Sequence, residues 1–396
     1  MLFKGRKYRF EVMVCVEGRW QMLCHCDDEK LAMADAKKAL ASGKVQAVKV
    51  VQQRTMLVLG TTTERVIFEE KAPPPGERPI SIASGPRDMS VCETVEDLFG
   101  PVSRRAIAQV MREYLAKMNL TPTELLYGWS HQKKLQDTGS LMLSAVQRIG
   151  TAQAQKTGEP ARQRCNHLDG LIGQALQRAR DFAAERKVLP AFDGKNVGAY
   201  SETIRGIVGE RHDHVLLSQV TLALADRRGL MGKLEAVQEM VAENPPWPVG
   251  MLLDGVMSDF LCFPEVIKDL FGNQRNFGSF LTNLADLLAN RPAAVERCPN
   301  AMLKAIVDGI HAGRLPQCRE VLLDRLSKEV ASDKPLDRLD PSADQRLMEK
   351  LADALKLADG SWLGGEEMGK AVETRRTLLR QQFLRSRGLT AIADNL

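Results

Sequence analysis

The spacing of apolar residues changes once along this chain, and that change constrains the fold more than any other feature. From Tyr8 to Val16, apolar and polar residues alternate, a period of two that is typical of a half-buried β-strand. After Cys92 the apolar residues recur every three or four positions, the spacing of amphipathic helices. We therefore expect an α+β N-terminal module followed by a large all-α helical region, with helices predominating.

The first 71 residues predict a ββαββ module. Strands are expected over 8–16 and 20–26, with a turn at 17–19 between them, and two more over 45–51 and 64–70. Asp27 and Asp28 are suited to begin the intervening helix, because short acidic side chains cap helix N-termini. Regular alternation would place four residues of the second strand on the face of Val12 and Val14. These four are Trp20, Met22, Cys24 and Cys26.

Residues 72–91 predict a linker, because they hold five prolines and two glycines with little apolar periodicity. Beyond it a dozen or more helices are expected. Most of them fall over 139–155, 162–186, 200–208, 214–227, 230–242, 250–260, 264–271, 277–290, 300–311, 316–330, 343–357 and 364–386. The segment NPPWPVG at 244–250 is the strongest break in this pattern. It would divide the region into bundles over 92–243 and 249–396, unless the two are continuous.

Composition narrows the class of protein. No segment has the apolar core of an export signal, and no run reaches the ~18 apolar residues that span a bilayer. Eight cysteines in 396 residues are too sparse for a disulfide framework. We therefore expect a cytoplasmic protein with no transmembrane segment, whose cysteines are free thiols.

The stretch Glu210-Arg211-His212-Asp213-His214 is one candidate for chemistry. Together with His167 and Asp254 it follows the ligand order of the metal-dependent HD phosphohydrolases, which it resembles in that order alone. In that family the His-Asp pair follows an apolar run, whereas here it precedes one. We therefore expect Asp213 to cap a helix that begins at His214, and we expect no metal and no cofactor.

The stretch LCHCDD is a second candidate. Cys24, His25 and Cys26 are zinc-ligand types, but a structural zinc site needs four ligands and the chain has no second Cys/His pair. On a strand, Cys24 and Cys26 would face the core and His25 would point away. The prediction is therefore two buried thiols and no metal site.

Basic residues offer candidates for partner binding. The first 71 residues hold 13 Lys and Arg against 9 Asp and Glu, so the module carries most of the net charge of +5. A basic amphipathic helix is also expected near the C-terminus. The candidates are Arg19, Lys37 and Lys38 in the module and Arg375, Arg376, Arg380 and Arg385 in the helix.

These patterns favour a non-enzymatic interaction or scaffold protein, or a regulatory adaptor, with a protein partner. One alternative is a helical metal-dependent phosphohydrolase that uses His167, His212, Asp213 and Asp254. Another is a nucleic-acid-binding protein that uses Arg19, Lys37, Lys38, Lys44 and Lys49 of the module. Nothing in the sequence specifies the oligomeric state.

Overall fold

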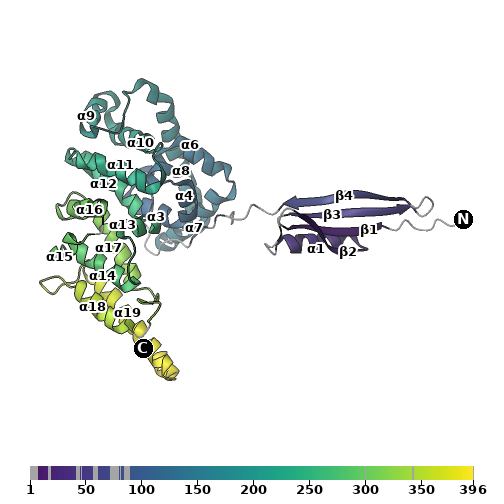
Figure 1. Ribbon diagram of the computed structural model, residues 1–396. Helices are drawn as coiled ribbons and strands as arrows, with labels where there is room; N and C mark the ends of the chain where they lie inside the picture. The colour runs from purple at the N-terminus through teal and green to yellow at the C-terminus, as the bar shows by residue number, and fades with distance from the viewer. Residues whose placement is uncertain are drawn as a thin grey trace. The chain divides into compact units, whose positions relative to one another are not determined.

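The computed structural model describes residues 8–16, 19–41, 45, 47–56, 61–71, 80, 82–83, 90–298, 300–340 and 343–395. The chain divides into two compact units, Met1–Ile80 and Ser81–Leu396. A four-stranded antiparallel sheet lies in the first unit and a large helical region in the second, as the sequence predicts (Figure 1). Most of the linker expected over 72–91, and the turn residues 17 and 18, lie outside the described residues.

The first unit has the predicted ββαββ order. Its elements are β1 (Tyr8–Val16), β2 (Arg19–Cys26), α1 (Glu29–Ala41), β3 (Ala47–Met56) and β4 (Thr61–Lys71). The strand order in the sheet is β2-β1-β3-β4, and every neighbouring pair is antiparallel. Asp28 starts α1, because its Oδ1 accepts a hydrogen bond from the backbone N–H of Leu31 at 3.0 Å.

Helix α1 packs on one face of this sheet (Figure 1). The small side chains of Ala32 and Ala36 are fully buried, which allows the helix to approach the strands closely. Their neighbours in this core are apolar residues of β1, β2 and β3: Phe10, Val12, Val14, Cys26, Val48 and Val50.

A β-bulge in β2 corrects the predicted face of two residues. Val12 pairs with Cys24, but the next residue, Met13, pairs with Met22, so Leu23 is the extra residue. Because side chains alternate, one extra residue reverses the faces on its N-terminal side. Cys24 and Cys26 therefore face α1 as predicted, whereas Trp20 and Met22 lie on the opposite face, 36% and 50% exposed.

The described residues of the second unit form helices and connecting loops, with one isolated β-bridge between Lys356 and Trp362. Its helices are α2 (Val95–Phe99), α3 (Pro101–Val110), α4 (Arg112–Met118), α5 (Pro122–Tyr127), α6 (Trp129–Asp137), α7 (Ser140–Thr157), α8 (Ala161–Glu185), η1 (Arg186–Val188), α9 (Val197–Val208), η2 (Gly209–Arg211), α10 (His212–Leu224), α11 (Gly229–Ala242), α12 (Trp247–Leu261), α13 (Pro264–Phe271), α14 (Phe277–Leu288), α15 (Pro292–Glu296), α16 (Ala301–His311), α17 (Pro316–Val330), α18 (Asp344–Ala354), α19 (Glu366–Ser386) and α20 (Thr390–Ala393). No helix in the described ranges combines the length and the apolar character required to cross a bilayer.

Local sequence signals account for many of these boundaries. Helices α5, α13 and α17 begin with a proline at their first position, where the missing N–H costs no hydrogen bond. Thr121 caps α5 in a reciprocal capping box with Glu124. Residues 243–246 separate α11 from α12, and the two helices pack against each other within the same compact unit.

Two acids of α12 fix other helices to it. The carboxylate of Asp254 accepts hydrogen bonds from the backbone N–H groups of Gln317 and Cys318 in the first turn of α17. The carboxylate of Asp259 accepts hydrogen bonds from Thr123 in the first turn of α5. Both acids are buried, and each satisfies donors that a helix N-terminus leaves without an intrahelical partner.

Candidate functional site

A cleft in the second unit combines aromatic and basic side chains. It has a volume of about 600 Å³, within the range of ligand-binding pockets. Helix α13, the loop 272–276, the start of α14, Arg325 of α17 and the loop 334–339 form its walls. Three phenylalanines, Phe271, Phe277 and Phe280, lie among five cations: Lys268, Arg275, Arg325, Lys334 and Arg338.

The aromatic part of the cleft is held by ring contacts. Phe271 and Phe280 meet edge to face, with ring centroids 5.0 Å apart, and Phe277 stacks on Phe280 at 6.2 Å. The ammonium group of Lys334 lies 5.6 Å from the centroid of Phe277. Phe277 and Phe280 are half-buried, so part of each ring remains open to a ligand.

Arg325 is the most deeply placed cation of the cleft. Its Nη2 donates hydrogen bonds to the carbonyl oxygens of Leu261 and Cys262, the end of α12, at 3.2 and 2.8 Å. Its Nε is buried and has no hydrogen-bond partner in the structure. Burial lowers the pKa of Arg325, but an arginine remains charged throughout the physiological range.

The loop 334–339 is fixed to two helices. The carboxylate of Asp344, at the start of α18, accepts the backbone N–H groups of Leu336 and Asp337 at 3.1 and 2.9 Å. Gly278 of α14 donates its N–H to the carbonyl of Leu336 at 2.9 Å. The loop is therefore a rigid wall that presents Lys334 and Arg338 to the cleft.

The charge of the cleft is strongly positive. Asp337 is the single acid among its lining residues, and it accepts hydrogen bonds from the N–H of Leu339 and the side chain of Asn276. These bonds lower the pKa of Asp337. Lys334 pairs with Glu329, whereas within the described ranges Lys268, Arg275 and Arg338 form no ion pair closer than 4.0 Å. Three exposed cations are thus available to an anionic ligand.

The four residues expected for a phosphohydrolase lie in three separate environments. His167 is exposed on α8 and contacts the carbonyl of Glu93, and Asp254 caps α17. Only His212 and Asp213 meet, with His212 Nδ1 donating to Asp213 Oδ1 at 2.8 Å. Among the described residues, these four do not form a group that could share one ion.

The sequence predicts Asp213 as the N-cap of a helix that begins at His214. Helix α10 begins instead at His212, so Asp213 lies in its first turn. The buried imidazole of His212 also meets Ser201 of α9, with Nε2 and Oγ 2.9 Å apart. This Ser-His-Asp order resembles a hydrolase triad in connectivity. However, Ser201 is completely buried and Asp213 is the exposed member, so a substrate cannot reach the serine. The three residues instead tie α9 to α10.

The basic candidates of the first unit do not gather on one surface. Lys37 and Lys38 are exposed on α1, whereas Lys49 lies near the Trp20 ring, 4.4 Å from its centroid, on the opposite face of the sheet. The side chain of Arg19 and the whole of Lys44 lie outside the described residues.

The C-terminal candidates belong to α19. Arg375 is buried and donates a hydrogen bond to the carbonyl of Lys334, which removes it from the surface. Arg376 pairs with Glu349 and Glu373, and Arg385 pairs with Asp394. Arg380 is exposed. Arg375 and Arg376 therefore help α19 to pack against the rest of the helical unit.

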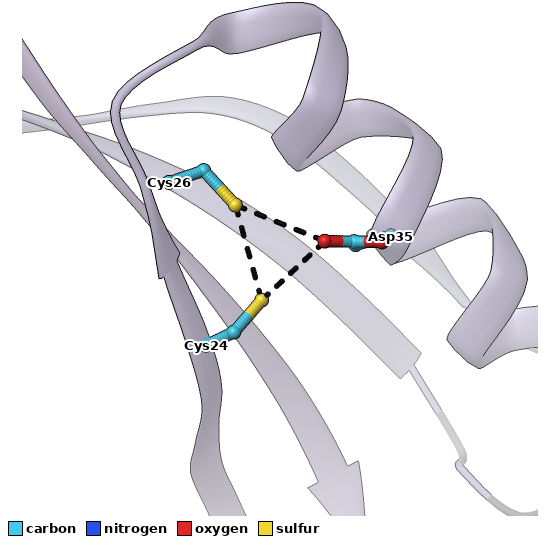
Figure 2. A group of neighbouring side chains, drawn as sticks. All are labelled: Cys24, Cys26 and Asp35. Atoms are coloured by element: carbon cyan, nitrogen blue, oxygen red, sulfur yellow. Dashed lines mark hydrogen bonds between the residues drawn. The ribbon is translucent and has the colours of Figure 1, made fainter.

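A second group of side chains lies in the first unit. Cys24 and Cys26 project from β2 toward Asp35 of α1, as Figure 2 shows. The two sulfur atoms are 4.0 Å apart, and each lies 3.8 Å from Asp35 Oδ2. Burial raises the pKa of Cys24 to about 11, with the hydrogen bond and charge of Cys26 and the charge of Asp35 acting in the same direction. Without an ion, this thiol is therefore neutral and donates to the carboxylate.

The sequence interpretation missed the cleft, and in the second group it weighed Cys24 and Cys26 but not Asp35. The cleft residues form no motif, because they come from several segments spread over 75 positions, from Pro264 to Leu339. Asp35 lies nine residues after Cys26, and only the crossing of α1 over β2 brings it there. Comparison with models of known protein families, with curated proteins and with solved structures finds no match.

Proposed function

We propose that this chain is a non-enzymatic interaction protein, a scaffold or regulatory adaptor, whose helical unit binds an acidic segment of a partner protein in the cleft. One observation carries the proposal: five cations and a single acid surround three phenylalanine rings in a cavity of about 600 Å³. A solvent-exposed surface without a binding role does not need the phenylalanine rings, and a hydrophobic core does not need the cations.

The chemistry of the cleft suits a peptide with both acidic and apolar side chains. The guanidinium groups of Arg275 and Arg338 can pair with carboxylates through two parallel hydrogen bonds. The half-buried rings of Phe277 and Phe280 can receive an apolar side chain next to those charges. Arginine and aromatic residues are also the types that contribute most to protein interfaces.

The cysteines support a location in the cytoplasm. All eight lie within the described ranges, and none of them forms a disulfide. A reducing compartment keeps thiols from forming disulfides, whereas an oxidising one favours disulfide formation. We therefore infer a cytoplasmic protein whose partner is cytoplasmic as well.

The test is to recover partners from the native host with the tagged full-length chain. The decisive variant is Lys268→Ala/Arg275→Ala/Arg338→Ala, which removes three exposed cations of the cleft. The matched control is Lys133→Ala/Lys187→Ala/Arg227→Ala, which removes three exposed cations that do not line it. We expect a protein that the wild type and the control retain and that the cleft variant loses. Its binding should weaken as salt rises.

Two outcomes would contradict the proposal. Equal recovery of every partner by the cleft variant and the wild type would show that the cleft is not the binding surface. Loss of the retained material on nuclease treatment would replace the protein partner by nucleic acid, the alternative based on basic residues. The phosphohydrolase alternative has no comparable support, because its four residues do not gather around one point in the structure.

A further inference from the structure

The two cysteines and the aspartate of the first unit have the positions of metal ligands. Cys24 and Cys26 occupy alternate positions of β2, so both sulfur atoms point to the face that α1 covers. Asp35 faces them from the second turn of α1 (Figure 2). The bulge at Leu23 precedes Cys24, so it leaves both cysteines on this face while it reverses the residues before them.

The separations match the size of one ion. The two sulfur atoms and Asp35 Oδ2 form a triangle with sides of 4.0, 3.8 and 3.8 Å. The point equidistant from the three atoms lies about 2.2 Å from each, a radius equal to the product of the sides divided by four times the area. Bonds from zinc are ~2.3 Å to sulfur and ~2.0 to 2.2 Å to a carboxylate oxygen. An ion slightly to one side of this plane, as tetrahedral geometry requires, can therefore bind with little movement of the three side chains.

The neighbouring candidates do not complete the group. His25 lies on the opposite face of β2, where its Nδ1 is 3.6 Å from Glu11 Oε1. Asp28 is engaged in capping α1. In the part of the chain that the structure describes, Cys24, Cys26 and Asp35 are the only three residues of these types close enough to share an ion. These residues thus supply three ligands, and a tetrahedral ion would take a solvent molecule or another external ligand as its fourth.

The ligand types decide which ion fits. Thiolates exclude calcium and magnesium, which take oxygen ligands, and select zinc, copper(I) or iron-sulfur clusters. A carboxylate is a poor ligand for copper(I), and a cluster needs more thiolates than the group offers. Two thiolates, one carboxylate and a solvent molecule are a ligand set that zinc accepts.

We propose that Cys24, Cys26 and Asp35 bind one Zn²⁺ ion, which links β2 to α1 and leaves one coordination position for an external ligand. The ion joins the edge strand of the sheet to the helix that covers it. Because the ligands come from two elements, binding stabilises their packing in the first unit.

The test uses the full-length chain, fully reduced and freed of metal, titrated with Zn²⁺ against a chromophoric chelator. We expect one ion per chain, and with Co²⁺ as a spectroscopic substitute we expect a thiolate-to-cobalt charge-transfer band. Cys24→Ser and Cys26→Ser should each weaken Zn²⁺ binding at least about tenfold. The control Cys15→Ser, in the same unit but on the other sheet face, should bind like the wild type.

Asp35→Asn separates binding from folding, because it preserves the size of the side chain and removes its charge. It should weaken Zn²⁺ binding at least about tenfold while circular dichroism shows an unchanged secondary structure. Zn²⁺ should also slow amide hydrogen exchange in 22–26 and 29–41 of the wild type more than in this variant. The proposal fails if the reduced wild type binds less than one ion per chain, or if Cys26→Ser and Cys15→Ser bind Zn²⁺ equally.

Discussion

The carboxylate of Asp259 accepts two hydrogen bonds from Thr123, one from its backbone N–H at 2.9 Å and one from its Oγ1 at 2.6 Å. The two residues are 136 positions apart in the sequence, and both are buried. Arg104, also buried, lies 3.6 Å from the same carboxylate and donates to Thr123 Oγ1. This contact fixes the start of α5 to the last turn of α12.

Replacement of Asp259 should destabilise the helical unit. Asp259→Asn preserves the shape of the side chain but removes the buried carboxylate that lies beside the Arg104 guanidinium, at a cost of about 2 to 4 kcal/mol in the free energy of unfolding. Urea unfolding followed by circular dichroism measures the loss. Asp169→Asn, an exposed position on α8, should change the free energy by less than about 0.5 kcal/mol. Similar losses for both variants would contradict the role of the contact.

A second buried contact should show strong coupling between its partners. Lys233 Nζ lies 2.6 Å from Glu124 Oε1, and both side chains are buried. Lys233→Met should cost about 3 to 5 kcal/mol, because it leaves the Glu124 carboxylate buried without a cation. The double variant Lys233→Met/Glu124→Gln should recover part of that loss. A double-mutant cycle from denaturant unfolding checks this, and simple additivity would disprove the coupling.

Alanine substitution of two glycines on adjacent helices should change the stability of the protein in opposite directions. A Cβ at Gly150 of α7 would lie 2.5 Å from the Cys165 sulfur and 3.1 Å from the Cys165 Cα on α8, so Gly150→Ala must push the helices apart. A Cβ at Gly170, exposed on α8, would meet nothing within 4 Å. We expect Gly150→Ala to destabilise by about 1 to 3 kcal/mol and Gly170→Ala to stabilise by about 0.5 to 1 kcal/mol. Thermal unfolding of both variants gives the two signs.

Stability should fall when the pH drops below the ordinary pKa of histidine. Burial lowers the pKa of His131 and of His214 to about 4, and nearby cations act in the same direction, Lys233 for the first and Arg178 for the second. His214 contacts the rings of Phe99 and Tyr127, an environment that disfavours a charge. The unfolded chain therefore binds protons between about pH 6.5 and 4 that the folded chain does not.

The contribution of these neutral imidazoles is thus complete above about pH 6.5 and is lost toward pH 4. Each histidine should contribute up to about 2 to 3 kcal/mol of this loss, and less where solvent reaches the ring. Unfolding free energies from pH 7 to pH 5 measure the slope, which His214→Gln should reduce. An unchanged slope in that variant would show that His214 is not a source of the pH dependence.

The sequence by itself determined the elements of this protein. Apolar periodicity defined β1 and located α13 and α17 at their observed bounds, because helices and strands depend on neighbours within a few residues. The same patterns supplied the order ββαββ and the predominance of helix. At ERHDHVLL they located the helix, although it begins at His212 instead of His214.

Only the tertiary structure decided which distant residues meet. The bulge at Leu23 depends on the pairing of β2 with β1, and it reversed the expected face of Trp20 and Met22. Asp35 reaches the two cysteines because α1 crosses the sheet at one particular position. The cleft likewise exists only where α13, α17 and the loop 334–339 converge. Such contacts join segments that carry no mutual signal along the chain, so packing and not local pattern positions both candidate sites.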